Sequence, residues 1–297
     1  KAVSRSAGAP SKRAAAKPSG KSAGSDRPVL LAQALPAATL VAQATATDAG
    51  VPLAADVSVK AVGEAEGADN TESQENRRVD IIVQPLLGRR KRLFLADMDS
   101  TMIEQECIDE LADFVGKKAH VAAITERAMN GELVFEEALR ERVALLKGLP
   151  ISVLQECFDK KITATAGAKE LVAAFKAKGG KAVLVSGGFT FFTERVAAML
   201  GFDEHYSNIL EVENGMLTGI VREPILGKEA KLAELHRQCK LLGCGAENVI
   251  AIGDGANDLP MLKAAGLGIA YHAKPAVAAQ VASRINHGDL SRVIHIL

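Results

Sequence analysis

Four short apolar runs bounded by Gly or Asp constrain the fold more than any other feature of this chain. They read RLFLADMD (92–99), KAVLVSGG (181–188), NVIAIGDG (248–255) and LGIAY (267–271). Segments with helical periodicity lie between them, such as GAKELVAAFKAKGG (167–180) and FFTERVAAMLG (191–201). Strands that are buried on both faces and alternate with helices predict an α/β fold with a doubly wound parallel sheet.

Polar residues stand at the end of three of these runs. They are Asp97 and Asp99 after the first, Ser186, Gly187 and Gly188 after the second, and Asp254, Asn257 and Asp258 after the third. In open parallel sheets, ligands bind beyond the carboxyl ends of the strands. The three groups are therefore predicted to meet in one site, where carboxylates are usable rather than buried at a cost of several kcal/mol.

The predicted cluster of Asp97, Asp99, Asp254 and Asp258 points to a particular chemistry. Four carboxylates would repel one another unless a cation lay among them, and hard oxygen ligands favour Mg²⁺. With Mg²⁺ bound, one carboxylate can attack a phosphoryl group and form an aspartyl-phosphate. A second, two residues further on, can protonate the leaving alcohol and later deprotonate the attacking water.

The motifs DMDST (97–101), SGGF (186–189) and GDGANDLPML (253–262) resemble those of the haloacid dehalogenase superfamily of Mg²⁺-dependent phosphatases. More narrowly, they resemble the bacterial-type phosphoserine phosphatases. The similarity continues through ECIDELA, ITERAMNGEL, LRERVALLKGLP and AGLGIAYHAKP, and it covers roughly residues 91–297. The resemblance implies a small helical cap inserted after the first core strand. It also implies hydrolysis of O-phosphoserine, the last step of serine biosynthesis.

The resemblance assigns a role to each aspartate of the motifs. By it, Asp97 is the nucleophile and Asp99 the general acid/base. The implied Mg²⁺ ligands are Asp97, Asp99 through its backbone carbonyl, and Asp254. The resemblance further implies that Asn257 contacts phosphate and that Asp258 orients the metal-bound water.

The catalytic lysine has two candidates in GKEAKLAEL (227–235), namely Lys228 and Lys231. In the family pattern this lysine precedes a helix with apolar residues four and seven positions later, which from Lys228 are Leu232 and Leu235. Lys228 is therefore expected to bind phosphate and to neutralise developing charge, with Lys231 as the open alternative. The interval from Lys228 to Asp254 exceeds the family interval by a few residues, which indicates an insertion around CKLLGCG.

The segment 103–164 carries four helical patterns directly after the first strand. An insertion placed there is expected to cover the site as a lid that excludes water. Phosphoserine presents an ammonium and a carboxylate besides its phosphate. Glu106 and Arg142, to which the resemblance also points, are expected to hold these two groups. Ser186 and the Gly187 amide are expected to donate to the phosphate oxygens.

The residues before 91 differ from the rest in composition. Residues 1–27 carry seven Lys and Arg against one Asp in an Ala/Ser/Gly/Pro background, so we expect a disordered basic arm. Residues 28–90 are expected to form an accessory region, with strands in ADVSVKAV (55–62) and RRVDIIVQP (77–85) around an acidic linker. The catalytic core then comprises 91–102 and 165–297, interrupted by the cap at 103–164.

Bulk properties exclude several partners and favour one compartment. Net charge is zero and Trp is absent, so nucleic acid is not expected as a partner. No apolar run is long enough to span a membrane. The four cysteines form no CxxC pair and are expected to be reduced thiols of a cytoplasmic protein. Organelle targeting is the alternative if residues 1–27 are a transit segment. The sequence leaves monomer and homodimer open.

The same residues argue against several other functions. A dehalogenase does not need the second aspartate, and a P-type ion pump has a threonine there, so Asp99 argues against both. A signalling module would keep its aspartyl-phosphate, whereas a general base at Asp99 should hasten its hydrolysis. A phosphotransferase, or a phosphatase for another small phosphomonoester, stays open as the alternative because it would use the same aspartates.

Overall fold

The computed structural model describes residues 57–62, 80–85 and 89–297 of the chain. The expectation of a disordered arm at 1–27 and the acidic linker at 63–76 lie outside these residues. Both predicted strands of the accessory region are confirmed: β1 (Val57–Val62) pairs antiparallel with β2 (Asp80–Pro85). The Asp80 carboxylate accepts hydrogen bonds from the backbone N–H groups of Asn286 (2.7 Å) and His287 (3.3 Å). This short hairpin is thereby fixed to residues near the end of the chain.

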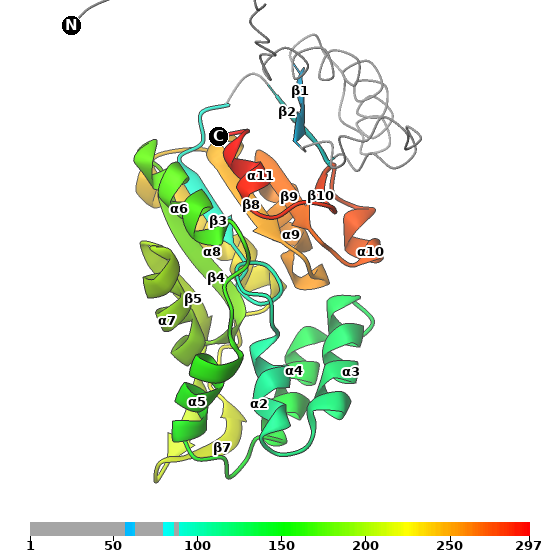
Figure 1. Ribbon diagram of the computed structural model, residues 1–297, viewed down its shortest axis with the longest axis vertical. Coiled ribbons are helices and arrows are strands. Elements are labelled where there is room, and N and C mark those ends of the chain that lie inside the picture. Colours follow the sequence, from blue (N-terminus) through cyan, green and yellow to red (C-terminus); the bar gives the residue numbers. More distant parts are fainter. Residues whose placement is uncertain (1–56, 63–79, 86–88) are drawn as a thin grey trace, which may run out of the picture. The chain divides into compact units, whose positions relative to one another are not determined.

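A six-stranded, entirely parallel sheet forms the centre of the molecule, in the order β10-β9-β8-β3-β4-β5 (Figure 1). Its strands are β3 (Leu93–Ala96), β4 (Lys181–Phe189), β5 (Glu204–Asn208), β8 (Val249–Gly253), β9 (Leu267–Tyr271) and β10 (Ser283–Ile285). All four apolar runs predicted as strands are in this sheet. The strand order reverses beside β3, because the chain proceeds to β4 and β5 on one side and returns to β8 on the other. The switch point of the sheet therefore lies between β3 and β8, where ligands bind in folds of this kind.

Helices cover both faces of the sheet, which confirms the doubly wound α/β fold. Alternate residues of the central strands face opposite ways, so Phe94 and Ala96 belong to one apolar cluster and Leu93 and Leu95 to another. The first face is covered by α6 (Ala168–Ala177), α7 (Thr190–Leu200) and α11 (Ser291–Ile294). The second is covered by α8 (Lys228–Leu242), α9 (Leu259–Ala264) and α10 (Pro275–Ala278).

Four helices lie between β3 and α6, all within the range 103–164 expected for the cap. They are α2 (Cys107–Asp113), α3 (Lys118–Met129), α4 (Phe135–Ala144) and α5 (Ser152–Lys161). Helices α2, α3 and α4 gather side by side beyond the strand ends (Figure 1). A single antiparallel bridge between Ile103 and Ala164 joins the two ends of the insertion. The insertion thus leaves the sheet region and re-enters it at one place.

A second hairpin, β6 (Leu210–Glu213) and β7 (Met216–Val221), follows the edge strand β5. Its turn residues Asn214 and Gly215 both have positive φ, 50° and 75°, as a tight type I′ turn requires. This confirms the hairpin interpretation of VENGML. Within the described part of the chain, every helix is too short or too polar to cross a lipid bilayer.

Candidate active site

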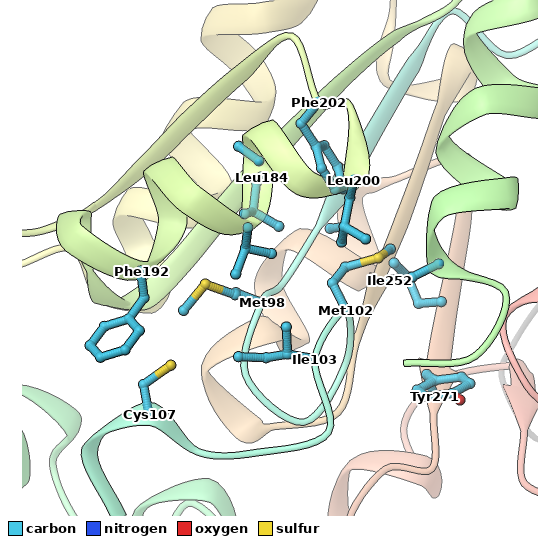
Figure 2. Packing of buried hydrophobic residues seen from close by; sticks show 14 of the residues in the cluster. Met98, Met102, Ile103, Cys107, Leu184, Phe192, Leu200, Phe202, Ile252 and Tyr271 are labelled. Atoms are coloured by element: carbon cyan, nitrogen blue, oxygen red, sulfur yellow. The ribbon is translucent and has the colours of Figure 1, made fainter. Parts of the chain in front are cut away.

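The loop after β3 is anchored in the core and fixes the two aspartates of DMDST. Met98, Met102 and Ile103 are fully buried and point into the apolar cluster beneath the loop (Figure 2). The backbone N–H groups of Met102 and Ile103 both donate to the Met98 carbonyl, at 2.8 and 3.0 Å. The Asp97 N–H continues the ladder by donating to the Ile252 carbonyl of β8 at 3.0 Å. Apolar residues inside the turn therefore hold Asp97 at the switch point.

A buried lysine, Lys231 of α8, bridges two of the predicted aspartates. Its Nζ atom lies 2.8 Å from Oδ1 of Asp97 and 2.6 Å from Oδ1 of Asp258, and its side chain is 0% exposed. Although burial disfavours the ammonium, the two carboxylates raise the pKa of Lys231. The pKa of Asp97 is raised by burial and by the Asp258 carboxylate. Lys231 therefore stays charged and offsets part of the negative charge of the cluster.

Lys228, the expected catalytic lysine, is not in this position. It is the first residue of α8 and is exposed to solvent, whereas Lys231 lies one turn further along and faces the sheet. The two side chains are about 60° apart around a helix of 3.6 residues per turn, so the start of the helix decides which one points inward. Starting from Lys231 also removes three residues from the interval to Asp254. The proposed insertion around CKLLGCG is then no longer needed to explain that interval.

Asp99 lies beside Ser186 at the end of β4. Its Oδ1 accepts a hydrogen bond from the Cys107 N–H at 2.9 Å, and its Oδ2 accepts one from the Ser186 hydroxyl at 3.3 Å. The Ser186 Oγ in turn accepts the Gly188 N–H at 2.8 Å. Burial raises the pKa of Asp99 in spite of these donors. A carboxyl with a raised pKa at this place suits a group that gives and takes a proton.

Three carboxylates fit a divalent cation. Oxygen atoms of Asp97, Asp254 and Asp258 lie within 4.8 Å of one another, and all three residues are buried. Burial and the Asp258 carboxylate raise the pKa of Asp254 to about 7. Among the described residues, Lys231 is the cation that forms ion pairs with these acids, and Lys274 acts on Asp254 from a greater distance. A hard cation such as Mg²⁺ would offset the repulsion between the three carboxylates.

The three carboxylates differ in how many of their oxygen atoms already accept hydrogen bonds within the protein. Both oxygens of Asp258 are engaged, Oδ1 by Lys231 and Oδ2 by the Gly255 N–H at 3.0 Å. Asp254 accepts the Thr101 hydroxyl at Oδ1, at 3.1 Å, and Asp97 accepts Lys231 and the Met98 N–H at Oδ1. Among the described residues, none donates a hydrogen bond to Oδ2 of Asp97 or Oδ2 of Asp254. These two oxygens are therefore the ones that remain for a metal or a phosphoryl group.

A pocket joins this cluster to the helical insertion. It is small and partly open to solvent. Its polar lining consists of Asp97, Asp99, Glu106, Arg142 and Asn257, with the backbone of Gly187 and Gly188. Its apolar lining consists of Ile108, Met129, Phe135, Leu139 and Phe189. Most of the predicted site residues, drawn from segments far apart in the sequence, thus line one small pocket.

Glu106 and Arg142, the residues expected to recognise the substrate, both line this pocket. Glu106 immediately precedes α2, and its Oε1 accepts the Ser100 hydroxyl at 2.7 Å. Burial and the nearby Asp99 raise its pKa well above the ordinary value. Arg142 of α4 is only 2% exposed, and burial lowers its pKa. Within the described part of the chain, Arg142 forms no ion pair with an Asp or Glu.

Asn257 and Ser186 differ in how they are placed for binding. The Oδ1 atom of Asn257 is buried without a hydrogen-bond partner, and an unsatisfied polar atom on a pocket wall is available to a ligand. Ser186 is fully buried behind Gly187 and Gly188, with its hydroxyl bonded to Asp99. The contact of Ser186 with phosphate therefore stays a prediction.

Two threonines of the site were not predicted from the sequence. Thr101 donates a hydrogen bond to Asp254, and Thr125 accepts one from Arg142.

Comparison with known proteins agrees with this geometry. The family model described as haloacid dehalogenase-like hydrolase matches residues 94–263. The chain therefore belongs to the haloacid dehalogenase-like hydrolases, enzymes of the α/β class that its sheet and acidic site define. Within them it falls among the phosphoserine phosphatases. It is 49% identical over 211 residues to phosphoserine phosphatase of Polaromonas sp. strain JS666, with 69% of this chain and 89% of that protein covered.

Solved structures support the same placement. A phospho-aspartyl intermediate analogue of phosphoserine phosphatase is 41% identical to this chain, with a TM-score of 0.67. A substrate-bound phosphoserine phosphatase complex is 40% identical, also with a TM-score of 0.67. Each match covers 69% of this chain and 98% of the other.

Proposed function

We propose that this chain hydrolyses O-phospho-L-serine to serine and inorganic phosphate, with Mg²⁺ as cofactor. One observation carries the proposal: a single small pocket is lined by the paired carboxyls Asp97 and Asp99 and by a buried guanidinium, Arg142, that has no acidic partner among the described residues. The first two groups suit phosphoryl transfer through an aspartate. The third suits a substrate that brings its own carboxylate.

The nucleophile in this mechanism is Asp97. Its Oδ1 is held by Lys231 and the Met98 N–H, which leaves Oδ2 to attack phosphorus. A bond forms between this oxygen and phosphorus while the bond from phosphorus to the serine oxygen breaks. Asp99, whose pKa is raised by burial, gives its proton to the departing serine oxygen. The product of this half-reaction is serine together with phospho-Asp97.

Water completes the cycle in the second half-reaction. The Asp99 carboxylate takes a proton from water as the water oxygen bonds to phosphorus, and the bond from phosphorus to Asp97 breaks. Inorganic phosphate is released, Asp97 is a carboxylate again and Asp99 is protonated. Lys231, held between Asp97 and Asp258, neutralises negative charge near the phosphoryl group throughout.

The donor set for Mg²⁺ consists of Asp97, Asp254 and the Asp99 backbone carbonyl, with Asp258 beside them. When bound, the ion would supply Lewis-acid polarisation of the phosphoryl oxygens. Asp258, whose two oxygens are already engaged, orients its neighbours in this scheme. Asn257, through its Nδ2 donors, and the Gly187 N–H bind the phosphate oxygens in this scheme, and both residues line the pocket.

Arg142 and Glu106 select the serine part of the substrate. Three N–H donors of Arg142 are left for a carboxylate, because two of the five possible are used within the protein. Glu106, one oxygen of which accepts from Ser100, offers the other to the substrate ammonium. The apolar wall that includes Met129 and Phe135 packs on the carbon atoms between them.

Phosphate release from O-phospho-L-serine, measured with and without Mg²⁺, tests this function. Phosphothreonine, phosphoethanolamine and glycerol phosphate serve as comparison substrates. Fast, Mg²⁺-dependent release favouring phosphoserine is the expected result. Comparable rates on all four esters would keep the aspartyl-phosphate chemistry and discard the substrate. No release from any of them would favour a phosphotransferase.

A further inference from the structure

Arg142 is held in place by two different helices. Its Nε–H donates to the Ala138 carbonyl of its own helix α4 at 3.0 Å. Its NH1 group donates to the Thr125 hydroxyl of α3 at 2.9 Å. These two bonds fix the plane of the guanidinium from two directions, because the fork geometry of Arg is rigid. The remaining N–H groups are then presented in one orientation at the pocket that Arg142 lines.

Thr125 passes this constraint on to a third helix. Its side chain is 3% exposed, and its hydroxyl lies 2.6 Å from Oδ1 of Asp109 in α2 and 3.0 Å from the Val121 carbonyl. A hydroxyl has one proton, and Arg142 can only donate, so the Thr125 oxygen accepts from Arg142 and gives its proton elsewhere. The shorter contact to a charged acceptor is the stronger one. The hydrogen-bonded order is therefore Arg142 to Thr125 to Asp109.

The hydroxyl between the two charged groups has a chemical consequence. A carboxylate in direct contact with the guanidinium would occupy the donors that a ligand carboxylate needs. Asp109 instead acts through Thr125, so its charge favours the protonated guanidinium from a distance while the donors stay free. Thr in a helix divides between two χ1 rotamers, and the contacts to Asp109 and to the Val121 carbonyl hold the hydroxyl in one of them.

We propose that Thr125 and Asp109 are positioning residues that set selectivity for phosphate esters carrying a carboxylate, by orienting Arg142 without competing for it. This inference rests on the proposed function, in which Arg142 binds the substrate carboxylate. It assigns the two residues no contact with substrate. Their effect is expected in the preference between substrates rather than in the chemical step.

Kinetics of Thr125→Val on two substrates test the proposal. O-phospho-L-serine and O-phosphoethanolamine differ only in the carboxylate. Loss of one hydrogen bond to a charged group is expected to lower the ratio of their kcat/KM values about tenfold, mainly through KM for phosphoserine. Thr125→Ser, which keeps the hydroxyl, should restore most of the ratio. Asp109→Asn, which keeps the shape and removes the charge, should lower it in the same direction.

The control is Thr193→Val, which removes another buried threonine hydroxyl, on α7, with hydrogen bonds to the Thr190 carbonyl and Ser207. It should leave the substrate ratio unchanged. Equal losses on both substrates in Thr125→Val, or an unchanged ratio, would overturn the proposal. Should Thr125→Val fail to fold, Asp109→Asn and Thr125→Ser decide the question in the same assay. A wild-type protein inactive on phosphoserine would instead refute the proposed function, while wild-type activity with an unchanged variant ratio would refute only the positioning role.

Discussion

The Nζ atom of Lys231 lies 2.8 Å from Oδ1 of Asp97, in a place where the lysine has no contact with solvent. The same Nζ atom lies 2.6 Å from Oδ1 of Asp258. Removing this ammonium would leave two buried carboxylates facing each other without their shared counter-charge, which is costly. The nucleophile proposed here is therefore oriented by α8, and changes to the lysine are expected to affect both activity and stability.

The two lysines of GKEAKLAEL should differ sharply on substitution. Lys231→Ala is expected to lower kcat/KM on phosphoserine by about a hundredfold or more, the usual scale for a lost electrostatic contact to the reacting group. Lys228→Ala, at the exposed start of α8, should stay within about twofold, since exposed charges contribute little. Steady-state kinetics on the two purified variants make the comparison. Equal losses in both would contradict the position of α8.

The two aspartates of DMDST should show different kinds of loss. Asp97→Asn removes the nucleophile and is expected to abolish turnover without unfolding the protein. Asp99→Asn should slow turnover about a hundredfold or more, the contribution of general acid/base catalysis. Circular dichroism checks the fold, and phosphate release measures the rates. Retained turnover in Asp97→Asn would refute the nucleophile, and a wild-type rate in Asp99→Asn would require another acid.

Gly188 leaves no room for a side chain beside the proposed acid. A Cβ at this position would lie 2.6 Å from Oδ2 of Asp99 and 3.0 Å from Oγ of Ser186. Gly188→Ala is therefore expected to displace the Asp99 carboxyl and to lower kcat at least tenfold, since misplaced catalytic groups lose effect steeply. Gly187→Ala is the matched variant, because its Cβ would meet the Phe135 ring at 2.6 Å and should act mainly on KM. Kinetics showing the opposite split would contradict this division.

The stability of the metal-free protein should depend on pH through the carboxyl of Asp254. Its pKa of about 7 is above the ordinary value, so the folded protein keeps a proton that the unfolded chain has already lost. The contribution of this group to stability therefore declines as pH rises from about 4 to about 7. With a chelator present, Asp254→Asn should gain in Tm relative to wild type over this interval. A difference in Tm that does not vary with pH would speak against the raised pKa.

Mg²⁺ should reverse that decline. A cation that binds only the folded state raises stability by mass action, and Asp254 is part of the proposed donor set. At about pH 7.5, added Mg²⁺ is expected to raise the Tm of wild type more than that of Asp254→Asn. Thermal unfolding in a Mg²⁺ titration measures both. Equal shifts in the two proteins would place the ion elsewhere.

Asp80 provides a test of the N-terminal hairpin. Asp80→Ala would leave the Asn286 and His287 N–H groups without this acceptor, at a cost of about 1–3 kcal/mol. A fall in Tm of several degrees with unchanged kcat is expected. Asp113→Ala, which removes an exposed pair with Lys161, is the control and should have little effect. An Asp80 variant with the Tm of wild type would show that this carboxylate contributes nothing to stability.

The central strands could be predicted from the sequence, and the edge strands could not. Central strands such as β3 and β8 are buried on both faces and therefore read as continuous apolar runs. The edge strand β5 has the sequence EHYSN and is only half-buried, so it carries no such signal. β10 is three residues long and also escaped prediction. Strand ends, and with them the aspartates, followed from the central runs alone.

The site could be predicted wherever a residue belongs to a motif, and less well where it depends on how elements pack. Asp97, Asp99 and Asp254 follow buried strands, so their positions were fixed once the strands were identified. Predicting Lys231 required the residue at which α8 starts and the rotation of the helix about its axis. The pattern of leucines four and seven positions after Lys228 did not determine either. Thr125 of α3 contacts Arg142 of α4, and the packing of these two helices cannot be predicted from the sequence of either helix alone.

The bridge between Ile103 and Ala164 bears on how enzymes of this design diversify. The chain departs from the sheet and comes back at adjoining residues, so the intervening helices form a cassette attached at one seam. Another cassette of different length could be joined at the same seam without shifting β3 or Asp97. A change of cassette would thus alter most of the apolar wall of the pocket, and the Cys107 contact to Asp99, while Asp97 and Asp254 stay on the sheet.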